Sequence, residues 1–198
     1  MKKPNNYEQT QEQGEYTPIE LGGHILVIKN VEETTSKNGR PMIVVSFCTA
    51  KNDRQPEYFT SQFKNDIRPD KKWPIQGTAY ILTEDTDGNC SRGFKTFTTS
   101  VKKSTPGFEI SWGDGFAQSL KNKPIGGVFG LIEDDYSGEV KKYRRLRWFR
   151  SVEGVLDADV PNEKLLPENK KSAQPPVSAG DDGFMDIPDG IDDELPFD

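Results

Sequence analysis

The sequence predicts a mainly β protein of five strands and one or two short helices, followed by a disordered acidic tail. Short apolar runs rich in β-branched and aromatic residues are separated by Gly, Asn and Pro turns, as in an antiparallel sheet. One stretch instead spaces its large apolar residues Phe94, Phe97 and Val101 three and four apart, which is the period of a helix. The last eighteen residues contain eight acidic side chains and no basic one, so they lack the apolar surface that a core needs.

The first two strands are expected to form a hairpin. Residues 21–31 are β-rich, with Leu26 and Ile28 on one face and Val31 on the other. An Asn-Gly turn follows, and residues 42–50 form the second strand. This strand begins with apolar side chains on both faces, so we expect it to lie in the centre of the sheet.

The third strand is expected at residues 56–64, where alternation puts Phe59 and Phe63 on one face and Tyr58 on the other. A polar and basic stretch comes next along the chain. Residues 78–84 form a further apolar run, which we assign to a strand that decorates the sheet.

The remaining elements are helical segments and two strands. Residues 92–103 have the spacing of a short amphipathic helix, and Asp114 is placed to cap a second one that carries Phe116. Strands are expected at residues 126–132 and 140–152. The order of three strands, a short helix and two strands is that of the OB-fold, a five-stranded barrel that binds oligonucleotides.

The chain divides into four parts. Residues 1–17 are polar and are expected to be flexible, and residues 18–155 form the OB-fold nucleic-acid-binding domain. Residues 156–180 are assigned to a linker, because the composition shifts there towards Asp, Glu, Asn, Pro and Lys. Residues 181–198 are the acidic tail, in which Pro and Gly interrupt any helix or strand.

Charge is segregated along the chain. The whole sequence has a net charge of -6, but the tail alone carries -8 and residues 1–150 carry +4. An acidic tail on a mildly basic body indicates that the partner of the body is a polyanion.

The sharpest functional pattern in the body is residues 141–150, where six of ten side chains are basic and three are aromatic. Basic side chains attract phosphates with little regard to sequence, and aromatic rings stack on unpaired bases. This combination suits a single-strand binder, since the bases of a duplex are already stacked. Alternation places Arg147 and Phe149 on one face and Trp148 on the other. Because one face must pack inward, some of these rings belong to the core.

Two further basic groups are candidates for binding. The first follows the predicted third strand and includes Trp73; the alternative is a solvated loop that this Trp anchors to the barrel. The second lies in the first hairpin turn, which corresponds to one of the OB-fold loops that bind ligands. The predicted nucleic-acid-binding residues are Lys37, Arg40, Tyr58, Lys64, Arg68, Lys71, Lys72, Trp73, Lys141, Lys142, Tyr143, Arg144, Arg147 and Trp148.

The tail has apolar residues in two short clusters among its acids, a pattern suited to docking into a basic-rimmed apolar pocket. Its closing stretch, Leu195-Pro196-Phe197, resembles the C-terminal tail of single-stranded-DNA-binding proteins, which ends in acids followed by Ile-Pro-Phe. Asp198 departs from that pattern, in which the Phe carries the terminal carboxylate; a generic solubilising tail is the alternative. The resemblance implies recruitment of replication and recombination proteins. The residues expected to bind the partner are Asp192, Asp193, Glu194, Leu195, Pro196 and Phe197.

A second resemblance runs along much of the body. Residues 36–41 between the first two strands and residues 120–130 before the last pair are similar to an uncharacterised family of phage proteins believed to be related to single-stranded-DNA-binding proteins. This resemblance also implies an OB-fold. The N-terminal pattern typical of the bacterial single-stranded-DNA-binding proteins is absent.

No catalytic or metal site is expected. His24 has no neighbouring nucleophile, and Cys48 and Cys90 form no ligand-spaced pair, so we predict a protein without enzymatic activity or cofactor. Cys48 lies in an apolar run and is predicted to be a buried free thiol. The sequence has no signal peptide and no membrane-spanning run, which predicts a soluble protein in the cytoplasm of a bacterial host cell and no membrane partner.

The function expected from the sequence is sequence-tolerant coating of single-stranded DNA, with partner recruitment by the tail. Two alternatives stay open. One is a recombination mediator or annealing accessory that binds DNA mainly to load another protein. The other is a phage interaction protein whose tail mimics the host tail and whose body binds no nucleic acid. A homo-oligomer is compatible with each of them.

Overall fold

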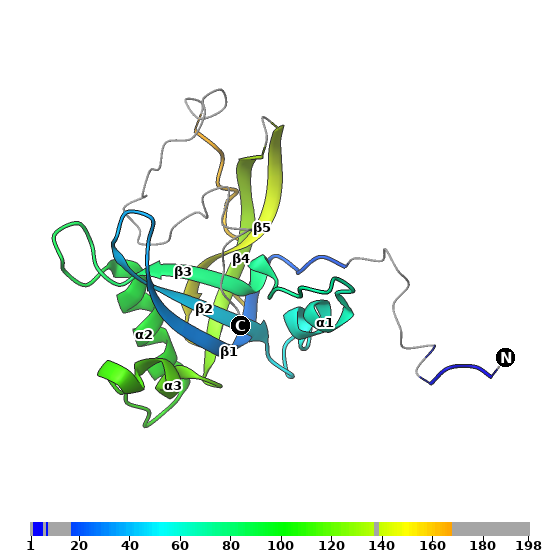
Figure 1. Ribbon diagram of the computed structural model, residues 1–198, viewed down its shortest axis with the longest axis horizontal. Helices are drawn as coiled ribbons and strands as arrows, with labels where there is room; N and C mark the ends of the chain where they lie inside the picture. The colour runs from blue at the N-terminus through cyan, green and yellow to red at the C-terminus, as the bar shows by residue number, and fades with distance from the viewer. Residues whose placement is uncertain (1, 6, 8–16, 137–138, 168–198) are drawn as a thin grey trace.

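One antiparallel sheet organises the chain. The computed structural model describes residues 2–5, 7, 17–136 and 139–167, and the acidic tail with its predicted docking residues lies outside these ranges. The sheet has the strand order β3-β2-β1-β4-β5 (Figure 1). Its strands are β1 (Gly22–Thr35), β2 (Pro41–Thr49), β3 (Thr78–Leu82), β4 (Pro124–Tyr136) and β5 (Glu139–Arg150).

Short helices connect the strands. The helix α1 (Tyr58–Asn65) lies between β2 and β3, while α2 (Arg92–Ser104) and α3 (Phe116–Leu120) lie between β3 and β4. Two single turns, η2 (Ile75–Gly77) and η3 (Gly113–Gly115), precede β3 and α3. The prediction of a mainly β fold of five strands with few short helices is confirmed. The sheet is open rather than a closed barrel, because within the described residues β3 and β5 form its two edges and do not pair.

The predicted third strand is wrong, because residues 58–65 form the helix α1. Phe59 and Phe63 lie four residues apart and therefore share a face in a helix as well as in a strand. On that helical face Phe59 packs against Phe47 with a ring-centroid distance of 5.8 Å, and Phe63 packs against Trp73 at 5.6 Å. The third strand of the sheet is instead β3, the apolar run that the sequence assigned to a decoration.

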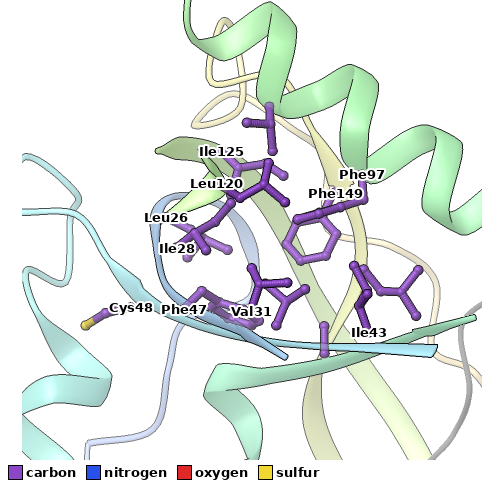
Figure 2. Close-up of a cluster of buried hydrophobic side chains, with 14 of the residues drawn as sticks. Leu26, Ile28, Val31, Ile43, Phe47, Cys48, Phe97, Leu120, Ile125 and Phe149 are labelled. Carbon is purple, nitrogen blue, oxygen red and sulfur yellow. The ribbon is translucent and has the colours of Figure 1, made fainter. Parts of the chain in front are cut away.

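A β-bulge in β1 changes which side chains face inward. The pairing of β1 with β2 shifts register between Ile28 and Asn30. A bulge inserts one residue and reverses the alternation beyond it. Val31 therefore joins Leu26 and Ile28 in the main core (Figure 2) instead of facing the opposite side, as alternation predicted.

The main core fills the inner side of the sheet beneath α2 (Figure 2). Phe97 of α2 and Phe149 of β5 meet there at 5.2 Å between ring centroids. The start of α2 is fixed by Ser91, whose hydroxyl oxygen accepts a hydrogen bond from the amide of Phe94 at 3.1 Å. Cys48 is a buried free thiol, as predicted.

Residues 156–167, within the range assigned to the linker, lie against the sheet. Just before them, Val155 is buried in a second apolar cluster with Val128 of β4. Gly23 is required there, since a Cβ at this position would lie 1.5 Å from the carbonyl oxygen of Val155. Further on, the amide of Lys164 donates to the carbonyl oxygen of Leu131 at 3.0 Å, so this segment pairs with the far half of β4.

A buried hydrogen bond between two side chains ties the start of β1 to the loop after β2. His24 Nδ1 lies 2.8 Å from Asp53 Oδ1, and both side chains are fully buried. The other ring nitrogen of His24 lies 3.0 Å from the carbonyl oxygen of Glu20. Burial raises the pKa of Asp53, but hydrogen bonds from His24 and from the amides of Gln55 and Ile25 outweigh it and leave the pKa below its ordinary value. His24 is thus a buried histidine whose two ring nitrogens both lie within hydrogen-bonding distance of a partner.

No helix among the described residues is long and apolar enough to cross a membrane. Within the same residues, no three His, Cys, Asp or Glu side chains are grouped so that they could hold a metal ion.

Asp53→Asn should lower the free energy of unfolding at pH 7 by about 1–3 kcal/mol, because an amide has one acceptor oxygen in place of two and leaves a buried donor of His24, Ile25 or Gln55 unpaired. The lowered pKa of Asp53 means that its stabilising contribution is present at neutral pH and is lost as the pH falls through the lowered value. Urea unfolding at pH 7 and pH 3 should show a smaller loss with acid in the variant than in the wild type. The matched control is Asp66→Asn, which removes a surface pair with Arg68 and should change stability little. Equal stability of Asp53→Asn and the wild type at pH 7 would refute the structural role.

Candidate nucleic-acid interface

The hairpin of β4 and β5 carries six of the fourteen predicted binding residues and rises beyond the rest of the sheet (Figure 1). Its basic strand pairs with an acidic one, since Lys142 is opposite Glu133 and Lys141 is opposite Asp134. Lys142 Nζ also lies 2.7 Å from a carboxylate oxygen of Glu163. The hydrogen bond to Glu163 raises the pKa of Lys142. Much of the basic charge at this end is therefore balanced within the protein.

A second bulge, in β5, decides which aromatic rings face outward. The pairing with β4 shifts register so that Val128 is opposite Trp148 while Phe129 is opposite Leu146. Leu146 and Phe149 consequently both pack against the core, which simple alternation does not allow. Trp148 faces outward and is 41% exposed.

Two of the predicted arginines hold the fold together. Arg144 donates a hydrogen bond to the carbonyl oxygen of Ile19, which is buried in the core. Arg147 donates to the carbonyl oxygen of Asn162 at 3.0 Å and lies over the ring of Trp148 at 5.9 Å from its centroid. These guanidinium groups are already engaged with the chain itself.

The segment of residues 17–20 explains this use of Arg144. Each of its four carbonyl oxygens lies within hydrogen-bonding distance of a polar side-chain atom. Tyr58 donates to Thr17 at 2.9 Å, Gln55 to Pro18 at 3.3 Å and Arg144 to Ile19, while His24 Nε2 lies 3.0 Å from the oxygen of Glu20. Three of these partners are 35 or more residues away along the chain, so no local sequence signal could have identified the segment. Two predicted binding residues, Tyr58 and Arg144, serve here as structural anchors.

The basic group after α1 is tied down in a similar way. Arg68 forms an ion pair with Asp66 at 2.8 Å, and its hydrogen bond lowers the pKa of Asp66 to about 2. Lys71 Nζ donates to the carbonyl oxygen of Lys64 at 3.2 Å. The indole nitrogen of Trp73 donates to a backbone oxygen of η2 at 3.1 Å, and the ring packs against the core. These contacts favour the alternative in which Trp73 anchors a surface loop.

The turn between β1 and β2 offers an exposed lysine. Gly39 has a φ of +73°, which lets the turn close, and Lys37 is exposed beside it. Arg40 donates to the carbonyl oxygen of Glu84 at 2.9 Å and so fixes the loop after β3. Figure 1 shows this turn, α1 with its following loop, and the β4–β5 hairpin projecting in three different directions, so the structure does not gather the predicted residues into one cluster.

The outer face of β2 and β3 corresponds to the surface that OB-folds commonly use for binding. It carries a third apolar cluster, and none of its side chains is more than 8% exposed. The members of this cluster are Met42, Val44, Tyr80 and Leu82. In this conformation the large exposed rings among the described residues are Tyr7, Trp112 and Trp148, of which the sequence prediction included only the last.

Comparison with known proteins adds no family. No protein-family model matches the chain, and no curated protein matches it.

Arg144→Ala should lower the free energy of unfolding by about 1.5–3 kcal/mol, the usual contribution of a hydrogen bond from a charged group, because it leaves the buried carbonyl oxygen of Ile19 unpaired. The matched control is Lys141→Ala on the same strand, where the exposed Lys pairs only with the nearby Glu139 and should contribute little. Urea unfolding of both variants measures the difference. Equal stabilities would contradict the anchoring role of Arg144.

Proposed function

We propose that this protein binds single-stranded DNA with little sequence preference and coats it. The observation that supports the proposal best is the sheet itself, whose order β3-β2-β1-β4-β5, with α2 between β3 and β4, is that of the OB-fold. OB-folds bind oligonucleotides through the loops that correspond to the β1–β2 and β4–β5 connections. Lys37 in the β1–β2 turn and Lys141 in the first part of β5 are both exposed.

Electrostatics and stacking both support a single strand as the ligand. The net charge of +4 on residues 1–150 favours a polyanion. Trp148 presents a partly exposed indole next to Arg147, and such a ring stacks on any unpaired base. A duplex offers phosphates but no free base faces, so it should bind through charge alone.

The acidic tail, residues 181–198, is proposed to recruit replication or recombination proteins to the coated strand. Its support is the sequence pattern alone, since these residues lie outside the described ranges. Phe197 and Leu195 are the side chains expected to enter an apolar pocket, while the acids steer the tail to a basic rim. The proposed place of action is the cytoplasm of a bacterial cell.

The full-length protein should bind oligo(dT) more tightly than a duplex of equal length at the same salt. The reason is that stacking adds about 1–3 kcal/mol per base on a single strand and nothing on a duplex. Fluorescence anisotropy with labelled oligonucleotides measures both affinities.

The salt dependence of the same titration supplies a control for charge. The logarithm of the binding constant falls linearly with the logarithm of the salt concentration, and each lysine that binds a phosphate of a single strand contributes about 0.7 to this log–log slope. Replacing Lys37 and Lys141 together by Gln should therefore make the slope about 1.4 less steep. Lys51→Gln, which removes an exposed lysine remote from both loops along the chain, should leave the slope unchanged. Equal affinity of the wild type for single strand and duplex would reject the proposed function.

Removal of residues 181–198 should abolish retention of a replication or recombination partner and leave oligo(dT) affinity unchanged, or slightly higher at low salt. Charge attraction between the tail and the body is largely screened beyond about 8 Å at physiological salt, so competition with DNA should be weak. Phe197→Ala alone should remove most of the retention, because a buried large apolar side chain contributes about 1.5–3 kcal/mol. Pull-down with purified candidate partners and anisotropy measure the two effects. Reduced DNA affinity without any retained partner would show that the tail belongs to the DNA-binding surface instead.

A further inference from the structure

The positive charge of the body is concentrated at one end of the fold. Residues 91–123, which contain α2 and α3, hold six basic and two acidic side chains, a net charge of +4. This equals the net charge of the whole of residues 1–150, so the rest of that range is neutral. The sequence prediction placed no binding residue in this segment.

Most of these basic side chains are not used by the fold. The side chains of Arg92, Lys95, Lys103 and Lys121 are exposed and form no hydrogen bond or ion pair with any described residue. On β5, by contrast, the predicted basic residues are engaged with carboxylates, backbone oxygens or neighbouring rings. A charge without an intramolecular partner keeps its full attraction for an external phosphate.

The same segment presents an exposed indole, whose ring lies beside Phe94, a residue of α2 between Arg92 and Lys95 in the sequence. Trp112 is 66% exposed and stacks on Phe116 of α3, with a ring-centroid distance of 5.6 Å and an interplanar angle of 16°. Phe94 of α2 flanks both rings, at 6.3 Å from Trp112 and 5.8 Å from Phe116. Because Phe116 covers one face of the indole and the side chain remains mostly exposed, the other face is open to a ligand.

The platform under Trp112 is fixed. Phe116 is only 5% exposed and belongs to the main core. The turn that presents Trp112 is tight, since a Cβ at Gly115 would lie 2.7 Å from the hydroxyl oxygen of Ser111. A ring held in place loses little entropy when a base stacks on it.

We propose that this α2–α3 surface, defined by Arg92, Lys95, Lys103, Trp112 and Lys121, is a contact site for single-stranded nucleic acid. One base stacks on the open face of Trp112, and the basic side chains contact the adjacent phosphates. The site extends the proposed function and rests on it. It lies on the side of the sheet where α2 and α3 pack, and α3 is at the opposite end of the molecule from the β4–β5 hairpin (Figure 1).

The combination of groups favours a single strand over an acidic peptide. A flat stack with one open face matches the planar face of a base, and every base has such a face. An acidic peptide could use the charges, but its apolar side chains need a concave pocket rather than an exposed ring. The bases of a duplex cannot stack on Trp112, because neighbouring bases already cover their faces.

The test compares full-length variants with labelled oligo(dT) of about 30 nucleotides, which exceeds the site size of about 4–16 nucleotides of a single OB-fold. Trp112→Ala should lower the affinity about fivefold or more, the decrease expected for one stacked base, and Trp112→Phe should retain most of it. Replacing Arg92 and Lys95 together by Gln should reduce the log–log salt slope by about 1.4. The matched control, Leu165→Ala, removes a similarly exposed apolar side chain outside the surface and should change neither quantity. Circular dichroism confirms that each variant is folded.

Three outcomes would overturn the inference. If the wild type binds oligo(dT) and Trp112→Ala binds it equally well, the α2–α3 surface is not a nucleic-acid site, although the proposed function stands. If Trp112→Ala instead removes only the binding of a synthetic peptide of residues 181–198, the surface is a docking site for the acidic tail. Failure of the wild type to bind oligo(dT) at all would reject the proposed function as well.

Discussion

The rest of the structure depends on a cluster of aromatic rings centred on Phe47. This ring lies 5.8 Å from Phe59 of α1, 6.3 Å from Phe129 of β4 and 5.9 Å from Phe149 of β5. Edge-to-face pairs of this kind contribute about 0.5–1.5 kcal/mol each beyond the area that they bury. The cluster joins three strands and two helices across an open sheet, because Phe149 also meets Phe97 of α2. It therefore decides which aromatic rings remain for a ligand.

Like the aromatic rings, the basic side chains are divided between those that support the fold and those that remain for a ligand. Arg144 and Arg147 satisfy backbone oxygens of segments that cross the sheet, and Lys142 joins β5 to residues 156–167. Some of the basic side chains therefore stabilise the fold, because a buried carbonyl oxygen without a hydrogen-bond partner lowers the free energy of unfolding. Among the described residues, exposed basic side chains without such a structural role include Lys37 on the β1–β2 turn and the four basic side chains of the α2–α3 surface. These are the positions from which a phosphate backbone can be held.

Sequence patterns predicted the mainly β fold and the helix α2, because periodicity and turn residues are local signals. They misplaced the third strand, since Phe59 and Phe63 fit a helix as well as a strand over so short a run. They also missed the bulges in β1 and β5, which reverse alternation without a composition signal, so Val31 and Phe149 were given the wrong neighbours. The dense basic run on β5 is visible in the sequence, whereas the packing of Trp112 against Phe116 and Phe94 of α2 forms only in the fold.

The central claim is that Lys37 of the β1–β2 turn and the basic side chains of the α2–α3 surface bind the strand, while Lys142, Arg144 and Arg147 support the fold. Lysine acetylation of the full-length protein with and without oligo(dT), followed by mass spectrometry, reads all lysines in one experiment. We expect protection of Lys37 on the β1–β2 turn and of Lys95 on the α2–α3 surface. The reactivity of Lys51 should stay the same in both samples. Unchanged reactivity of Lys37 and Lys95 under conditions where oligo(dT) is bound would contradict the claim.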